Sequence, residues 1–152
     1  KALWKTKTDA GNLHPRSRSL QGTAMSLQIE IYPPVNGNQY VLLSGRLDSA
    51  SYEQLDDALE PLLHAAKPAM VLVMDLAHLD YISSAGIRCI LKARKALAPT
   101  GKVLAVNPQA QIRKVLDMVQ ALPLGDIFNS TAEADAYIDA LQQEILQGNG
   151  GA

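Results

Sequence analysis

Residues 69–97 read AMVLVMDLAHLDYISSAGIRCILKARKAL, and this stretch decides the fold. Its apolar run at 70–74 has the length and composition of a central strand that is buried on both faces. The segment after Ser84 repeats its apolar residues at helical spacing. The stretch therefore predicts a buried strand, a short loop that leads to Ser83, and a helix whose N-terminus carries a serine hydroxyl.

A serine at a helix N-terminus has two interpretations. The first turn of a helix has unpaired backbone N–H groups and a partial positive charge, which together suit a phosphate group. The simpler interpretation is an N-cap, in which the hydroxyl only accepts a hydrogen bond from one of those N–H groups. We expect Ser83 to be the N-cap and Ser84, the next residue, to present its hydroxyl outward.

The flanking sequence predicts an alternation of strands and helices. We expect a hairpin of strands at 27–31 and 40–43, with Pro33-Pro34 and Asn36-Gly37-Asn38 in its turn. A helix that starts near Asp48 or Ser49 and stops before Pro68 follows it. After the central segment we expect a strand at 103–106, a helix that begins at Asn107-Pro108, a short edge strand near 127–128, and a last helix with a capping box from Ser130 to Glu133. Strands that alternate with helices imply parallel crossovers. We therefore predict an α/β layer architecture with a mixed sheet of four to five strands and helices packed against it.

Hydrophobic spacing also predicts which side chains the helices bury. The expected core positions are Leu55, Leu59, Leu62 and Leu63 in the first helix, Ile87, Ile90, Leu91 and Leu97 in the second, Ile112, Val115, Leu116 and Val119 in the third, and Ala134, Ile138, Leu141 and Ile145 in the last. The single cysteine, Cys89, lies among apolar neighbours, so we expect a buried core residue. Lys92, Arg94 and Lys95 are expected to form a basic face on the second helix.

Composition agrees with one small domain and gives no reason to expect nucleic acid or a membrane. The chain has 152 residues, 47% of them hydrophobic, and a formal net charge of -1. No apolar run approaches the roughly 20 residues that span a bilayer. One cysteine cannot form an internal disulfide, so we expect a reducing cytoplasm.

The two ends of the chain differ from its middle. Residues 1–24 are basic, have no helical or strand period, and precede Met25, which could be an initiator. We expect this segment to be vector-derived or a translated leader, with a basic interaction arm as the alternative. The domain is expected at 25–147, followed by a flexible Gly-rich tail at 148–152.

The 71–97 segment resembles the signature of the STAS domain of bacterial anti-sigma factor antagonists. The resemblance covers roughly residues 27–146, and a second family feature is matched by Gly45-Arg46-Leu47-Asp48. In this family the phosphoacceptor lies two residues before the glycine of the signature, which is Gly86 here. The resemblance therefore implies Ser84 as the phosphorylation site, with Ser83 as the alternative. Many members carry Asp where this chain has Ser83, and members often carry a second glycine where it has Arg88.

The resemblance implies a partner-switching regulator and no catalysis by the chain itself. The unphosphorylated domain would bind an anti-sigma factor that is also a serine kinase, the kinase would supply ATP and Mg²⁺, and a phosphatase would reset the site. The implied partner-binding residues are Asp48, Tyr81, Ser83, Ser84, Ala85, Gly86 and Arg88. Asp48 has helix N-capping as its simpler interpretation.

Two alternatives remain at this point. The first is a STAS scaffold without phosphorylation, such as a subunit of a lipid-transport or signalling assembly. The second is a hydrolase with Ser84 as nucleophile and His78 as base, which lacks the Gly-x-Ser-x-Gly elbow of such enzymes. No Cys/His spacing suggests zinc and no P-loop is present, so we expect neither a metal nor a nucleotide cofactor.

Overall fold

The computed structural model describes residues 16–17 and 26–146. Its elements, in chain order, are β1 (Arg16–Ser17), β2 (Gln28–Val35), β3 (Asn38–Leu47), α2 (Tyr52–His64), β4 (Val71–Ile82), α3 (Ser84–Leu97), β5 (Lys102–Val106), α4 (Ala110–Val119), the 3-10 turn η1 (Leu124–Asp126), β6 (Ile127–Phe128) and α5 (Thr131–Leu146). None of the helices within this described part is long and apolar enough to cross a membrane.

The strands form one mixed sheet whose spatial order follows the chain, β1-β2-β3-β4-β5-β6. The pairs β1/β2 and β2/β3 are antiparallel, and all later neighbours are parallel. The α/β mixed sheet is therefore confirmed. The two-residue β1 was not predicted; Arg16 lies opposite Ile31, and the rest of the expected leader at 1–24, like the tail at 148–152, lies outside the described residues.

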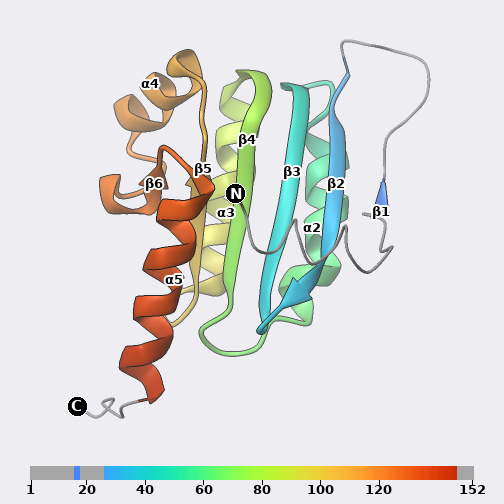
Figure 1. Ribbon diagram of the computed structural model, residues 1–152. Helices are drawn as coiled ribbons and strands as arrows, with labels where there is room; N and C mark the ends of the chain where they lie inside the picture. The colour runs from blue at the N-terminus through green and yellow to red at the C-terminus, as the bar shows by residue number, and fades with distance from the viewer. Residues whose placement is uncertain (1–15, 18–25, 147–152) are drawn as a thin grey trace.

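The helices cover both faces of the sheet (Figure 1). The larger core lies between the sheet and α2, α3 and α4, where Leu55, Ile90 and Leu116 pack against strand residues. On the opposite face, Ala134 and Ile138 of α5 pack against Tyr40, Val71, Val73, Leu104 and Val106. The strand β4 contributes to both cores, as a continuous apolar run predicts.

Three strands, β2, β3 and β4, are longer than expected by more than one residue, and β3 spans Asn38–Leu47 where 40–43 was expected. β4 does not end at Asp75 but continues to Ile82, and its second half pairs with β3 from Ser44 to Leu47, with one register shift before this segment and one within it. Pro33-Pro34 lies inside β2, where the register shifts between Tyr32 and Val35, and not in the turn. The turn is confined to Asn36 and Gly37, whose φ angles of 54° and 82° suit these residue types.

Two helices begin later than predicted. α2 begins at Tyr52 after the N-cap Ser51, and α4 begins at Ala110 instead of Asn107-Pro108. Asn107 does not cap α4; it has a φ of 59° and donates hydrogen bonds to Asp75 and Thr131. Its side chain thus connects the end of β5, where Asn107 lies, to Asp75 of β4 and to Thr131 of α5.

The predicted core positions are mostly correct, with two clear errors. Leu91 is 40% exposed and Val119 is 51% exposed. Cys89 is buried, as expected. The side chain of Ile145 lies outside the described part. At the start of α5, Ser130 Oγ accepts the Glu133 N–H at 3.2 Å, so this half of the capping box is confirmed.

Candidate functional site

The start of α3 is held by Ser83. Its Oγ accepts the N–H of Gly86 at 3.5 Å, and its carbonyl oxygen accepts the first helical hydrogen bond, from Ile87, at 2.9 Å. The N–H of Ser83 donates to Leu47 O at the end of β3, also at 2.9 Å. Ser83 is therefore the N-cap, as predicted, and its polar groups are committed to holding the helix.

Ser84 is the first residue of α3 and is exposed. Its hydroxyl forms no hydrogen bond with the part of the chain that the structure describes. The first turn of α3 also contains no acidic residue. The hydroxyl thus stands in the positive end of the helix dipole, where a phosphate would be stabilised.

Ala85 and Gly86 are buried residues of this first turn. A Cβ atom at Gly86 would lie 2.7 Å from Leu47 Cγ and 2.9 Å from Ile82 Cγ1, closer than real side chains approach. Glycine at this position lets α3 lie directly against the ends of β3 and β4. The absence of a side chain at Gly86 therefore determines how close the first turn of α3, with Ser84, lies to the ends of the strands.

Apart from the residues at the start of α3, a cluster of side chains lies at the carboxyl ends of β3 and β4. The guanidinium carbon of Arg46 lies 4.1 Å from the ring centre of Tyr81, and Arg46 Nε is 3.4 Å from Asp48 Oδ2. Tyr81 is 41% exposed. The sequence motif contained Arg46, but its role was missed; only the pairing of Arg46 with Tyr81 across the two strands brings cation and ring together.

Asp48 shapes the turn before α2 and is not its N-cap, since Ser51 has that position. Partial burial raises the pKa of Asp48, but hydrogen bonds from the Ala50 N–H and the Ser51 hydroxyl, together with Arg46, lower it by more, so the pKa lies below its ordinary value. The side chain is a carboxylate at neutral pH, paired with Arg46 beside the exposed ring of Tyr81.

Arg88 is exposed four residues after Ser84, so the two side chains lie on one face of α3. The predicted site residues thus fall into two groups: Ser83, Ser84, Ala85, Gly86 and Arg88 on α3, and Asp48 with Tyr81 at the strand ends. The hydrogen bond between Ser83 and Leu47 joins the groups.

The pairing of Ser84 with His78 that a hydrolase would need is not formed among the described residues. His78 lies on β4 opposite Ser44, and no base is hydrogen-bonded to Ser84 among the described residues. In the same part of the chain, no group of His, Cys, Asp and Glu could hold a metal ion. Burial, followed by the effect of Asp56, raises the pKa of Cys89 to about 12, which leaves it a neutral thiol.

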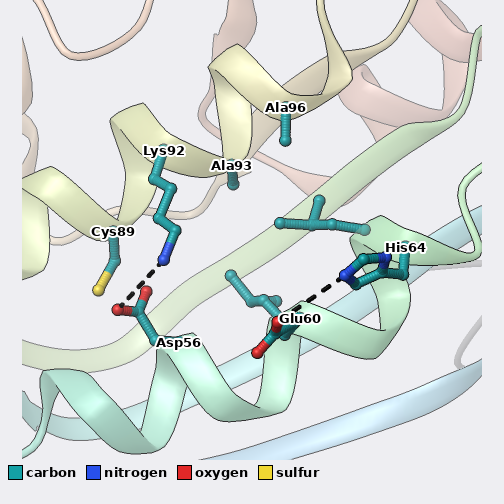
Figure 2. Close-up of a pocket in the computed structure, with 9 residues that line it drawn as sticks. Asp56, Glu60, His64, Cys89, Lys92, Ala93 and Ala96 are labelled. Carbon is teal, nitrogen blue, oxygen red and sulfur yellow. Dashed lines mark ion pairs between the residues drawn. The ribbon is translucent and has the colours of Figure 1, made fainter.

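Two adjoining pockets lie along the line of contact between α2 and α3, called here the seam, close to Ser84. Figure 2 shows the one farther from Ser84, a pocket of about 250 Å³ with Asp56, Glu60 and His64 from α2 and Cys89 and Lys92 from α3. The other has a volume of about 440 Å³ and includes Ala85 and Arg88. An ion pair between Lys92 Nζ and Asp56 Oδ2, 3.8 Å long, spans the seam and lines both.

Comparisons with known proteins agree with this fold. Residues 27–134 match the family model of the STAS domain. Over 109 residues the chain is 33% identical to BtrV of Bordetella bronchiseptica, a proposed anti-sigma factor antagonist; the match covers 70% of this chain and 92% of BtrV. The chain belongs to the STAS domain family, among the anti-sigma factor antagonists.

Solved structures of the family share the fold at low sequence identity. An anti-sigma factor antagonist from Mycobacterium paratuberculosis superposes with a TM-score of 0.66 at 16% identity, covering 78% of this chain and 98% of that one. The phosphorylated form of the Bacillus cell fate determinant SpoIIAA gives a TM-score of 0.58 at 18% identity, covering 72% and 98%. These similarities confirm the predicted architecture.

Proposed function

We propose that this protein is a partner-switching antagonist of an anti-sigma factor, with Ser84 as its phosphoacceptor. The observation that carries the proposal is the division of labour between the two serines: Ser83 is committed to capping α3, whereas the Ser84 hydroxyl is exposed. The identity with BtrV and the existence of a phosphorylated form of SpoIIAA support it. The domain at 25–147 carries this function, in the cytoplasm.

In the unphosphorylated state, the protein binds an anti-sigma factor with serine-kinase activity and thereby frees the sigma factor. The kinase brings ATP and Mg²⁺. Ser84 Oγ attacks the γ-phosphorus of ATP, the bond from that phosphorus to the bridging oxygen breaks, and ADP leaves. Ser83 stands where many relatives have Asp, so the proton of the Ser84 hydroxyl passes to a base of the kinase.

Phosphorylation then excludes the partner without refolding the domain. The phosphate adds about -1.5 to -2 charges at neutral pH on a rigid helix, in the middle of the docking surface. Asp48, Tyr81 and Arg88 form the rest of that surface in this proposal. A phosphatase removes the phosphate and restores binding.

A scaffold without phosphorylation is the second candidate, and Ser83 in place of an acid is the observation that favours it. Ser84→Asp separates the two candidates. A switch protein loses its anti-sigma factor when a charge stands at residue 84, whereas a scaffold keeps its complex.

The direct test is phosphopeptide mapping of the protein from its native host, sampled with and without stress. Phosphate on Ser84 that changes with condition is the expected result, and Ser84→Ala should abolish it. Ser83→Ala is the matched control and should keep the phosphate. An unmodified Ser84 under all conditions, or phosphate found only on Ser83, would contradict the proposal.

A further inference from the structure

The larger hollow of the α2–α3 seam, called here the α3 hollow, begins directly beside Ser84. Its lining includes Ala85, the residue after Ser84, and it runs along α3 as far as Lys95. Tyr52 of α2 forms part of the opposite wall. A molecule bound in the α3 hollow would therefore reach the first turn of the helix.

The α3 hollow is cationic. Arg88, Lys92 and Lys95 follow one another at spacings of four and three residues, which places them on one face of α3. The only carboxylate in the lining is Asp56, and it is paired with Lys92. Neither Arg88 nor Lys95 forms an ion pair with the residues that the structure describes.

An exposed apolar side chain stands within this row of cations. Leu91 is one of four exposed large hydrophobic side chains in the described part of the chain, and it lines the α3 hollow together with Ala85 and the half-buried Tyr52. Apolar surface surrounded by charges of one sign is suited to a partner with the opposite charge pattern around an apolar residue.

We propose that the α3 hollow binds an acidic segment of the partner, with carboxylates facing Arg88 and Lys95 and one apolar side chain placed against Leu91. This inference rests on the proposed function, because it takes the partner to be the anti-sigma factor. Charge complementarity selects the occupant. Beyond the Asp56–Lys92 ion pair the next pocket is lined by Glu60 and His64 and no longer by a row of cations (Figure 2). In this proposal the acidic segment therefore ends at that ion pair.

The geometry couples this site to Ser84. A phosphate on Ser84 would lie one helical turn from Arg88 and would attract its guanidinium. The same phosphate would repel the carboxylates of the bound segment. Phosphorylation would thus act twice against an acidic partner, by removing a cation from the α3 hollow and by adding negative charge at its end.

A peptide titration tests the site without the partner. The probe is a blocked synthetic peptide of glutamates around one central leucine, with a lysine peptide of the same design for comparison, and the readout is the amide chemical shifts of the full chain. We expect the glutamate peptide alone to shift Arg88, Leu91 and Lys95. The double variant Arg88→Glu/Lys95→Glu should weaken binding about a hundredfold, about tenfold for each reversed charge.

The matched control is Lys67→Glu/Lys114→Glu, which reverses two exposed cations outside the seam and should bind like the wild type. Equal binding of the glutamate and lysine peptides, or equal loss in the two double variants, would overturn the inference.

Once the anti-sigma factor is identified, the same variants are compared in binding and in phosphorylation assays. Peptide binding in the α3 hollow with no phosphate transfer to Ser84 would refute the switch and leave the acidic docking site standing. Phosphate transfer with full partner binding by Arg88→Glu/Lys95→Glu would do the reverse.

Discussion

The N–H of Ser83 donates a 2.9 Å hydrogen bond to the carbonyl oxygen of Leu47, so the end of β3 and the start of α3 are directly joined. This bond places Asp48, the residue after Leu47, and Ser84, the residue after Ser83, on either side of one contact. The backbones of the two segments cannot separate at this point without breaking the bond. A rigid junction favours an electrostatic switch over a conformational one, and its rigidity can be measured.

The close approach at Gly86 is the first feature to test. Gly86→Ala would place a methyl group 2.7 Å from Leu47 Cγ, and both Leu47 and the neighbouring Ile82 are buried. We expect the free energy of unfolding to fall by about 1–3 kcal/mol in urea titrations, despite the higher helix propensity of alanine. Gly125→Ala is the control, since its added methyl group has no described atom within 4 Å apart from those of Gly125 and its two chain neighbours. Equal midpoints for both variants would show that α3 can move away from β3.

The two serines should differ in stability as well as in phosphorylation. Ser83→Ala removes the acceptor of the Gly86 N–H and should cost about 1 kcal/mol. Ser84→Ala removes no hydrogen bond to the described residues and replaces serine with the best helix former, so stability should stay equal or rise slightly. Thermal unfolding of both variants gives the comparison. A larger loss for Ser84→Ala would mean that Ser84, and not Ser83, holds the helix.

The turn at Asp48 should make stability sensitive to acid. Because the pKa of Asp48 is lower in the folded protein than its ordinary value of 3.8, its contribution to stability is present above that value and is lost as the pH falls through the folded pKa. Asp48→Asn should therefore be less stable than the wild type at pH 6, with a gap that closes below pH of about 3.8. Asp57→Asn, at an exposed carboxylate without a hydrogen bond to the described residues, is the control. A gap that persists unchanged at low pH would assign the loss to packing.

Burial should protect the Cys89 thiol. The pKa of Cys89 is raised to about 12, mainly by burial, so almost no thiolate is present at pH 8. A thiol reagent should react only as fast as the protein opens, and urea at the unfolding midpoint should accelerate the reaction. Fast reaction in native buffer would mean that the reagent reaches the thiol through the pocket of Figure 2, which Cys89 lines.

The sequence predicted the centre of the fold well because its signals there are local. The apolar run of β4, the cap at Ser83 and the helix after Ser84 depend on residues close together in the chain. The errors have non-local causes. β4 continues to Ile82 along its pairing with β3, and Asn107, at a positive φ, donates to Asp75 and Thr131, which are far from it in the chain. The exposure of Leu91 depends on how α2 lies against α3, which no periodicity encodes.

The Ser84→Asp variant should distinguish an effect on stability from an effect on binding, because we expect it to raise the free energy of unfolding and to lower the affinity for the partner. The first turn of α3 contains no acidic residue, so a carboxylate at position 84 interacts favourably with the helix dipole. We expect the free energy of unfolding to rise by about 0.3–1 kcal/mol at low ionic strength. The same carboxylate should weaken binding of the anti-sigma factor and of the glutamate peptide.

Ser84→Asn is the matched control for size without charge. It should bind the glutamate peptide like the wild type and show no gain in stability from the dipole. Urea titrations at low and high salt, run beside the peptide titrations, give both readouts on the same samples. A Ser84→Asp variant that is less stable than the wild type would show that residue 84 is packed and not presented outward. Loss of binding would then report misfolding, and the charge mechanism would fail.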